Sequence, residues 1–161
     1  MSKVFHKAVR QIFNAKVNVI FSDIGITLPS ITNPGIQNFS SFKAIWDTGA
    51  TNTVITEKIV NALSLMPTGK INCSGVHGNA VVNTYIVNIY LPNKVIIENV
   101  KVSEGKLLGA IDMLVGMDII QLGDFSISNP NGKTVFSYCI PSHDNPVDLL
   151  EKSEKVNKRK S

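Results

Sequence analysis

The stretch that decides the fold reads Ile45-Trp46-Asp47-Thr48-Gly49-Ala50-Thr51-Asn52-Thr53-Val54-Ile55. In the residues leading into it, Phe42 to Trp46, the apolar Phe, Ala and Trp recur at every second position. That alternation predicts a half-buried strand that ends at Asp47. A short apolar run, Thr53-Val54-Ile55, follows the loop. Asp47 is therefore expected at the start of a loop that leaves a buried strand.

The loop places a carboxylate, a small hydroxyl and a glycine in succession at Asp47, Thr48 and Gly49. A glycine at this position lets the backbone approach another chain or a ligand closely, and the hydroxyl of Thr48 can fix the loop by hydrogen bonding. Asp-Thr-Gly is also an ordinary turn sequence. The triplet alone therefore leaves a catalytic loop and a plain turn both open.

Around this loop the patterns alternate between strands and turns. The segment from Lys16 to Thr27 predicts a strand or a hairpin. Thr56 is placed to cap a helix over Glu57 to Leu65, which has one apolar face. From Ile71 to Leu91, a glycine-interrupted segment followed by a long alternating run predicts a hairpin with a flexible tip. Strands thus dominate this half of the chain.

The second half continues the same way. Val95 to Val102 predicts a strand, and the wholly apolar run Met113-Leu114-Val115, which ends at Gly116, predicts a buried one. Asp118 is placed to cap a short helix, and residues 125–138 predict a closing hairpin around Asn131-Gly132. We expect one mostly β domain over residues 16–140, between an N-terminal extension, 1–15, of uncertain order and a flexible, charged tail, 141–161.

Three motifs together resemble the retropepsin-like aspartic proteases over Phe42 to Tyr138: the Asp47 loop, the segment Ser74-Gly75-Val76-His77-Gly78, and Met113-Leu114-Val115-Gly116-Met117-Asp118. The resemblance implies a closed, antiparallel barrel with one or two short helices. It also implies site residues: Asp47 as the catalytic acid; Thr48, Gly49, Ala50 and Thr51 as support in the loop; Gly75, Val76, His77 and Gly78 as a flap over substrate; and Leu114, Val115 and Gly116 as structural residues beside the loop. Met117 departs from the viral pattern, which has arginine there.

Peptide hydrolysis of this kind needs two carboxylates that share one proton. None of the other aspartates of the chain is followed by Thr-Gly or Ser-Gly. The second carboxylate is therefore expected from Asp47 of an identical chain in a twofold homodimer. The expected activity is that of an aspartic endopeptidase that acts on polypeptides with water as the nucleophile and needs no cofactor.

Two alternatives stay open at this point. The first is a catalytically inactive, dimeric peptide-binding module of the same fold. The second is a metal-dependent activity that uses His77, Asp112, Asp118 or His143, whose side chains suit metal ions. No pair among these four has ligand spacing, so the sequence favours no metal site.

Composition restricts the partners. The formal net charge is +4, but residues 151–161 alone contribute +3 of it, so no basic face for nucleic acid is expected. The stretch Leu149 to Lys160 is expected to be a solvated tail, with a short partner- or membrane-binding helix as the alternative. Cys73 and Cys139 predict buried, reduced thiols. Charges at Lys7, Arg10 and Lys16 argue against a leader peptide, and no run is long enough to span a membrane, so a cytoplasmic protein is expected.

Overall fold

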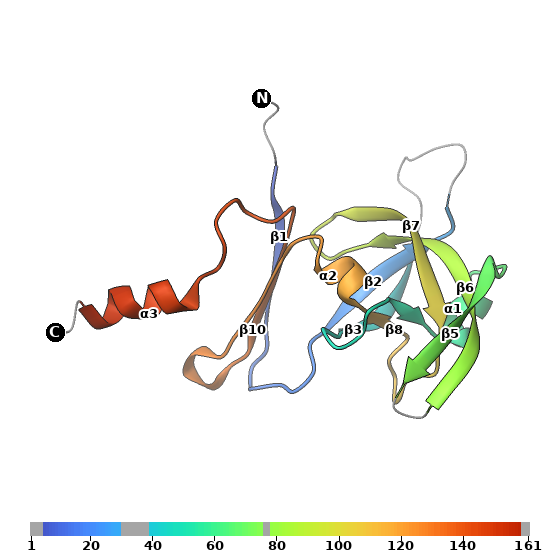
Figure 1. Ribbon diagram of the computed structural model, residues 1–161, viewed down its shortest axis with the longest axis horizontal. Coiled ribbons are helices and arrows are strands. Elements are labelled where there is room, and N and C mark those ends of the chain that lie inside the picture. Colours follow the sequence, from blue (N-terminus) through green and yellow to red (C-terminus); the bar gives the residue numbers. More distant parts are fainter. Residues whose placement is uncertain (1–4, 30–38, 76–77, 159–161) are drawn as a thin grey trace.

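The computed structural model describes residues 5–29, 39–75 and 78–158 (Figure 1). Its elements follow in chain order: β1 Lys7–Ile12, β2 Phe21–Thr27, β3 Ser40–Trp46, β4 Val54–Ile55, α1 Glu57–Ala62, β5 Gly69–Gly75, β6 Gly78–Tyr90, β7 Ile96–Glu104, β8 Met113–Val115, α2 Met117–Ile120, β9 Asp124–Ser128, the 3-10 turn η1 Pro130–Gly132, β10 Val135–Ile140 and α3 Leu149–Lys158.

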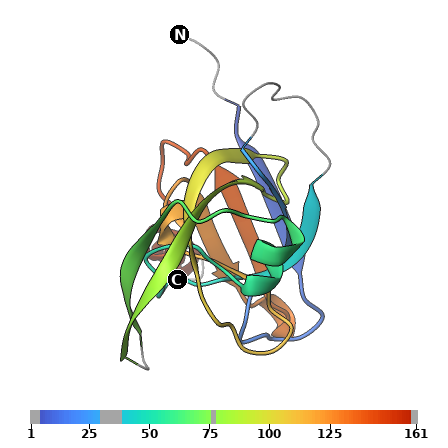
Figure 2. The same cartoon turned by 90° about the vertical axis from the view of Figure 1, so that its right-hand side faces the viewer.

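Six strands close into a barrel. Their order is β2-β3-β8-β4-β7-β6, and β2 pairs with β6 to complete the ring, while β5 pairs only with β6. All neighbours are antiparallel except β3 with β8 and β4 with β7, which run parallel. Figure 2 shows the β5–β6 hairpin, in green, extending beyond the barrel. The predicted closed, mostly β, retropepsin-like barrel is confirmed, with two parallel pairs within it.

The core of the barrel comes from alternate residues of its strands. Ile24 and Ile26 on β2 and Val87 and Ile89 on β6 are fully buried, as the period of two requires for inward-facing positions. All three residues of β8 are buried, in agreement with its wholly apolar sequence. The barrel therefore holds β8 as an interior strand with neighbours on both sides.

A second, three-stranded sheet has the order β1-β10-β9. Trp46, at the end of β3, joins it to the barrel, because its ring lies 5.1 Å from that of Phe136 and 4.9 Å from that of Tyr138, both on β10. The Tyr138 hydroxyl donates a 2.6 Å hydrogen bond to the carbonyl of Ile119. Burial raises the pKa of Tyr138 well above its usual value. The second sheet is thus fixed to the barrel by buried aromatic contacts.

Strand β1 lies in the segment for which the sequence left the order uncertain. It pairs along its whole length with β10, from Lys7 opposite Ile140 to Ile12 opposite Val135. The residues of β1 are all exposed or half-buried, and its sequence shows no regular alternation of apolar and polar residues. The strand depends on pairing with a segment that is distant in the chain. Local periodicity therefore could not reveal it.

Helices differ from the expectation in two places. Helix α1 ends at Ala62, earlier than the predicted Leu65, and the Thr56 hydroxyl at its start donates to the Asp112 carbonyl instead of capping it. Helix α3 forms in the charged tail, has no buried residue and projects away from the two sheets (Figure 1). Among the described residues, no helix is long and apolar enough to cross a bilayer.

Candidate functional site

The loop that begins at Asp47 straddles the end of a neighbouring strand. In the barrel, β8 lies between β3, which enters the loop, and β4, which leaves it. Trp46 pairs in parallel with Val115, whereas Val54 pairs antiparallel with Leu114. The chain from Asp47 to Thr53 must therefore cross over the end of β8, at Gly116.

Asp47 is held by its own loop and by β8. Its backbone N–H donates to the Val115 carbonyl at 3.0 Å, and its Oδ1 accepts a 2.8 Å hydrogen bond from the Gly49 backbone N–H. Within the described residues, Oδ2 has no hydrogen-bond partner. The carboxylate is half-buried, so it is fixed through one oxygen and presents the other.

Gly116 is where β8 and the loop come closest. A Cβ atom at this position would lie 2.6 Å from the carbonyl carbon of Asn52 and 3.0 Å from the carbonyl oxygen of Ala50. The next residue, Met117, donates its backbone N–H to that same Ala50 oxygen at 2.8 Å. Because backbone meets backbone here, any side chain would push the loop away from β8.

Asp118 anchors the far end of the loop. Its Oδ2 accepts from the Thr53 backbone N–H at 2.9 Å and its Oδ1 from the Thr53 hydroxyl at 2.8 Å. The Thr53 hydroxyl oxygen in turn accepts from the Gly116 N–H at 3.2 Å. The sequence predicted Asp118 as a helix cap, but Gly116 is the N-cap of α2. The hydroxyl and the backbone N–H of a buried Thr53 need hydrogen-bond partners. That need was the signal from which this role of Asp118 could have been predicted.

The predicted site residues fall into three groups. Thr48, Gly49 and Thr51 are exposed and Ala50 is half-buried, while Leu114, Val115 and Gly116 are buried beside the loop. Within the described residues, Thr48 makes no side-chain hydrogen bond, so the loop is fixed through Gly49 and Thr53 instead. Gly75 and Gly78 face each other across the β5–β6 hairpin, and Val76 and His77 lie outside the described residues.

Trp46 fixes the strand that delivers Asp47. Its indole Nε1 donates a 3.0 Å hydrogen bond to the Ser22 hydroxyl, which donates to Oε1 of Gln11 at 3.2 Å. The ring is buried against Phe136 and Tyr138, so it is a core residue. The backbone just before Asp47 is therefore held from both sheets.

A groove of about 1140 Å³ runs between α1, the hairpin strand β6 and the segment after β7. Its wall includes Lys58 on α1, Val82 on β6 and Leu107 in the following segment. Asp47 lines neither this groove nor a smaller one of about 470 Å³ beside Asp118.

Of the four residues of the metal alternative, His77 lies outside the described residues, and the structure does not bring the other three together. Asp112 pairs with Lys58 at 2.9 Å and accepts from the Lys43 backbone, and Asp118 is engaged by Thr53. His143 lies instead with His6 and Cys139, a grouping that the sequence did not suggest. Cys139 is buried as predicted, whereas Cys73 is only half-buried.

Residues 34–122 match the sequence profile of a family described as "gag-polyprotein putative aspartyl protease". The chain belongs to this family. The profile spans the Asp47 loop, the β5–β6 hairpin and β8, but it excludes the barrel strand β2 as well as β1, β9, η1, β10 and α3. The second sheet of this aspartyl-protease family member is therefore formed by strands outside the matched region.

Several solved structures are similar to this family member. A retropepsin-like aspartic protease from Rickettsia conorii has 16% identity and a TM-score of 0.49, with 87% of this chain and 98% of that chain covered. The EIAV protease in complex with the inhibitor HBY-793 has 21% identity and a TM-score of 0.46, with coverages of 66% and 92%. The retroviral protease-like domain of Ddi1 from Leishmania major has 16% identity and a TM-score of 0.41, with coverages of 81% and 100%. No curated protein sequence matches the chain.

Proposed function

We propose that this protein is an aspartic endopeptidase whose active site forms when the Asp47 loops of two identical chains meet on a twofold axis. The observation that carries the proposal is the state of the Asp47 carboxylate. One oxygen is fixed by the Gly49 N–H at 2.8 Å, and the other has no hydrogen-bond partner among the described residues, in a loop that is braced on β8. The Gly49 contact alone is that of an ordinary Asx turn, but this loop is also braced on β8 and anchored at Thr53 by Asp118.

The need for a second chain follows from the chemistry. One carboxylate cannot both accept a proton from water and donate one to the substrate carbonyl oxygen at the same step. The sequence has a single Asp-Thr-Gly, and Thr48 and Gly49 beside Asp47 are exposed in the single chain. An isologous contact would bring the two identical loops together and cover these residues.

In the dimer, the two Asp47 carboxylates share one proton, because two like charges so close cannot both ionise. The ionised carboxylate takes a proton from water, and the oxygen of that water attacks the peptide carbonyl carbon. The protonated carboxylate gives its proton to the carbonyl oxygen. Collapse of the tetrahedral intermediate breaks the C–N bond, with a proton delivered to the leaving amine. No metal or cofactor enters these steps.

The other predicted site residues receive supporting roles. Gly49 fixes the carboxylate, Thr48, Ala50 and Thr51 shape the loop, and Leu114, Val115 and Gly116 form its floor. The hairpin tip from Gly75 to Gly78, with Val76 and His77, would close over bound polypeptide as a flap. The groove between Lys58 and Leu107 would continue the binding surface away from the scissile bond.

The proposal is tested by Asp47→Asn, which keeps an acceptor oxygen for the Gly49 N–H but cannot ionise. Wild-type protein, this variant and the control Asp23→Asn, at an exposed position on β2, are compared for cleavage of a denatured protein mixture from acidic to neutral pH. Oligomeric state is recorded in parallel. We expect dimers in all three and loss of cleavage in Asp47→Asn alone. Dimers with no cleavage in any of them would support the inactive peptide-binding module instead.

A further inference from the structure

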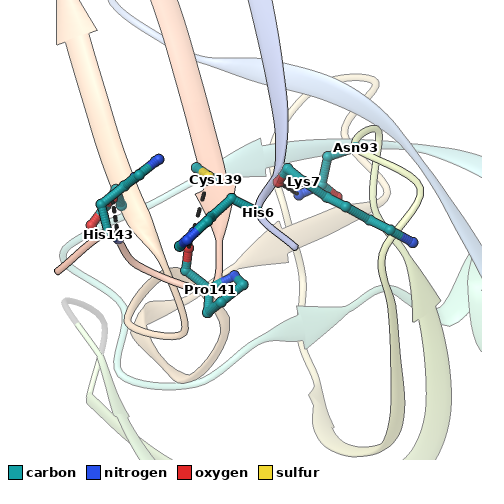
Figure 3. Close-up of polar contacts among 7 residues, drawn as sticks. His6, Lys7, Asn93, Cys139, Pro141 and His143 are labelled. Atoms are coloured by element: carbon teal, nitrogen blue, oxygen red, sulfur yellow. Dashed lines mark hydrogen bonds and ion pairs between the residues drawn. The ribbon is translucent and has the colours of Figure 1, made fainter. Parts of the chain in front are cut away.

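Three donor side chains meet at one end of the second sheet, away from Asp47. His6 directly precedes β1, Cys139 lies on β10, and His143 follows that strand beyond Pro141. One possible ligand atom from each lies within 4.8 Å of the other two. Figure 3 shows the three residues gathered at this end of the sheet. We name His6, Cys139 and His143 the sheet-end cluster.

Each imidazole of the sheet-end cluster already has one nitrogen engaged by an oxygen. Nδ1 of His143 lies 2.7 Å from Oδ2 of Asp124, which also accepts from the His143 backbone N–H at 2.9 Å. Nδ1 of His6 lies 3.1 Å from the Pro141 carbonyl oxygen. A carboxylate or carbonyl on one nitrogen is the usual support of a metal-binding histidine, because it fixes the ring and its tautomer. Nε2 of each ring makes no hydrogen bond among the described residues, so it is the nitrogen available to an ion.

The thiol of Cys139 supplies the third donor. The residue is buried, 7% exposed, and opposes Asp124 across the β9–β10 pair. The one hydrogen bond of its sulfur among the described residues is a long one, 3.8 Å to the Pro141 carbonyl oxygen. The sheet therefore fixes the position of this sulfur, whose hydrogen bond to Pro141 is weak.

The two imidazole rings must reorient to accept an ion. They stack with centroids 4.4 Å apart and an angle of 5° between their planes. Two nitrogens on one tetrahedral zinc ion lie roughly 3.3 Å apart, and each nitrogen donates in the plane of its ring, so the stacked rings must tilt until both planes meet at the ion. His6 is exposed and the side chain of His143 is 56% exposed, so both rings have room to tilt.

We propose that the sheet-end cluster is a zinc site, with Cys139 sulfur, one nitrogen each of His6 and His143, and a water molecule as the four ligands. A mixed imidazole and thiolate set suits zinc among the abundant divalent ions. The thiol releases its proton to solvent when the ion binds. The ion would tie the start of β1 to the end of β10, so it would stabilise the second sheet. The site is separate from the proposed protease chemistry and stands or falls without it.

The test uses the full-length, untagged chain stripped of metal with a chelator that is then removed. Cobalt is the first probe, because a thiolate-to-cobalt charge-transfer band reports a Cys ligand directly. We expect one cobalt per chain with this band, and its loss when one equivalent of zinc is added. At zinc concentrations 100-fold above Kd, the melting temperature should rise by roughly 5–10 °C.

Variants assign the ligands. His6→Gln and His143→Gln change exposed side chains, so they should keep the metal-free melting temperature while they lose the cobalt band. Cys139→Ala should lose the band as well. Cys73→Ser and His77→Gln remove the remaining thiol and imidazole of the chain and should leave the band unchanged. Asp124→Asn should weaken zinc binding by roughly 10–100-fold, because it alters the support of His143.

Two results would overturn the proposal. One is the absence of a charge-transfer band and of stoichiometric zinc binding in the wild-type chain. The other is a band that persists in folded His6→Gln and His143→Gln, because the sulfur would then bind metal without the imidazoles. Since both histidine variants are at exposed positions, this decision does not depend on whether Cys139→Ala folds.

Discussion

The Asp118 carboxylate accepts two hydrogen bonds from Thr53, one from the hydroxyl at Oδ1 and one from the backbone N–H at Oδ2. Thr53 is fully buried, and it is the last residue of the loop before β4. The carboxylate thus fixes the point where the loop that carries Asp47 rejoins the barrel. Disturbing this pair should affect the site without touching Asp47.

We predict that Asp118→Asn destabilises the fold by about 1–3 kcal/mol. An amide of the same shape offers only one acceptor, so either the Thr53 hydroxyl or its buried backbone N–H loses its partner. Urea unfolding followed by far-UV circular dichroism measures the change. Asp23→Asn, exposed on β2, is the matched control and should stay within about 0.5 kcal/mol of wild type. Equal stability of the two variants would mean that Asp118 is not an anchor.

Gly116→Ala should cost more than about 3 kcal/mol or abolish folding. The added Cβ would meet the Asn52 backbone at 2.6 Å, and neither backbone segment can retreat without breaking its hydrogen bonds. Gly69→Ala is the comparison, since its Cβ would meet only the side chain of Thr84, at 3.3 Å. Thermal unfolding of both variants checks the difference. A Gly116→Ala protein as stable as Gly69→Ala would show that the close crossing at β8 is not required.

Ser22→Ala should destabilise the protein by about 1–3 kcal/mol, because it leaves the buried indole N–H of Trp46 without an acceptor. Trp46 is the only tryptophan, so its fluorescence reports this site alone. Denaturant unfolding followed by that emission gives the free energy of unfolding. Ser41→Ala, exposed on β3, serves as the control. Unchanged stability in Ser22→Ala would contradict the proposed tie between Trp46 and β2.

Lys58→Ala should change stability by less than about 1 kcal/mol, although the Lys58 nitrogen lies 2.9 Å from Asp112. The lysine side chain is 68% exposed, and ion pairs at such positions contribute little. Asp112→Ala should cost more, because Asp112 also accepts from the backbone N–H of Lys43 on β3. Urea unfolding of the two variants gives the order, and a larger loss in Lys58→Ala would reverse this interpretation.

The parts of the fold that the sequence predicted are those with a local signature. The alternation up to Trp46, the apolar run of β8 and the turn at Asn131-Gly132 each need only neighbouring residues to be recognised. The barrel follows from them together with the resemblance. These segments also contain Asp47 and Gly116, so most of the candidate site could be predicted from the sequence.

The parts that the sequence did not predict depend on contacts between distant segments. Strand β1 is recognised only through its pairing with β10, and Asp118 acquires its role only because Thr53 lies beside it across the loop crossing. The rings of His6 and His143 stack with centroids 4.4 Å apart, although one residue is near the start of the sequence and the other is near its end. Such contacts cannot be predicted from the periodicity or the residue spacing of a short stretch of sequence.

The most direct test of the shared active site is to mix subunits. Wild-type and Asp47→Asn chains are unfolded together in equal amounts, refolded, and assayed for peptide cleavage at constant total protein. If each site needs Asp47 from both chains, only wild-type pairs cut, and activity falls to about a quarter of the wild-type value. Activity of about half would show that each chain acts alone, which would contradict a site built by two copies of Asp47.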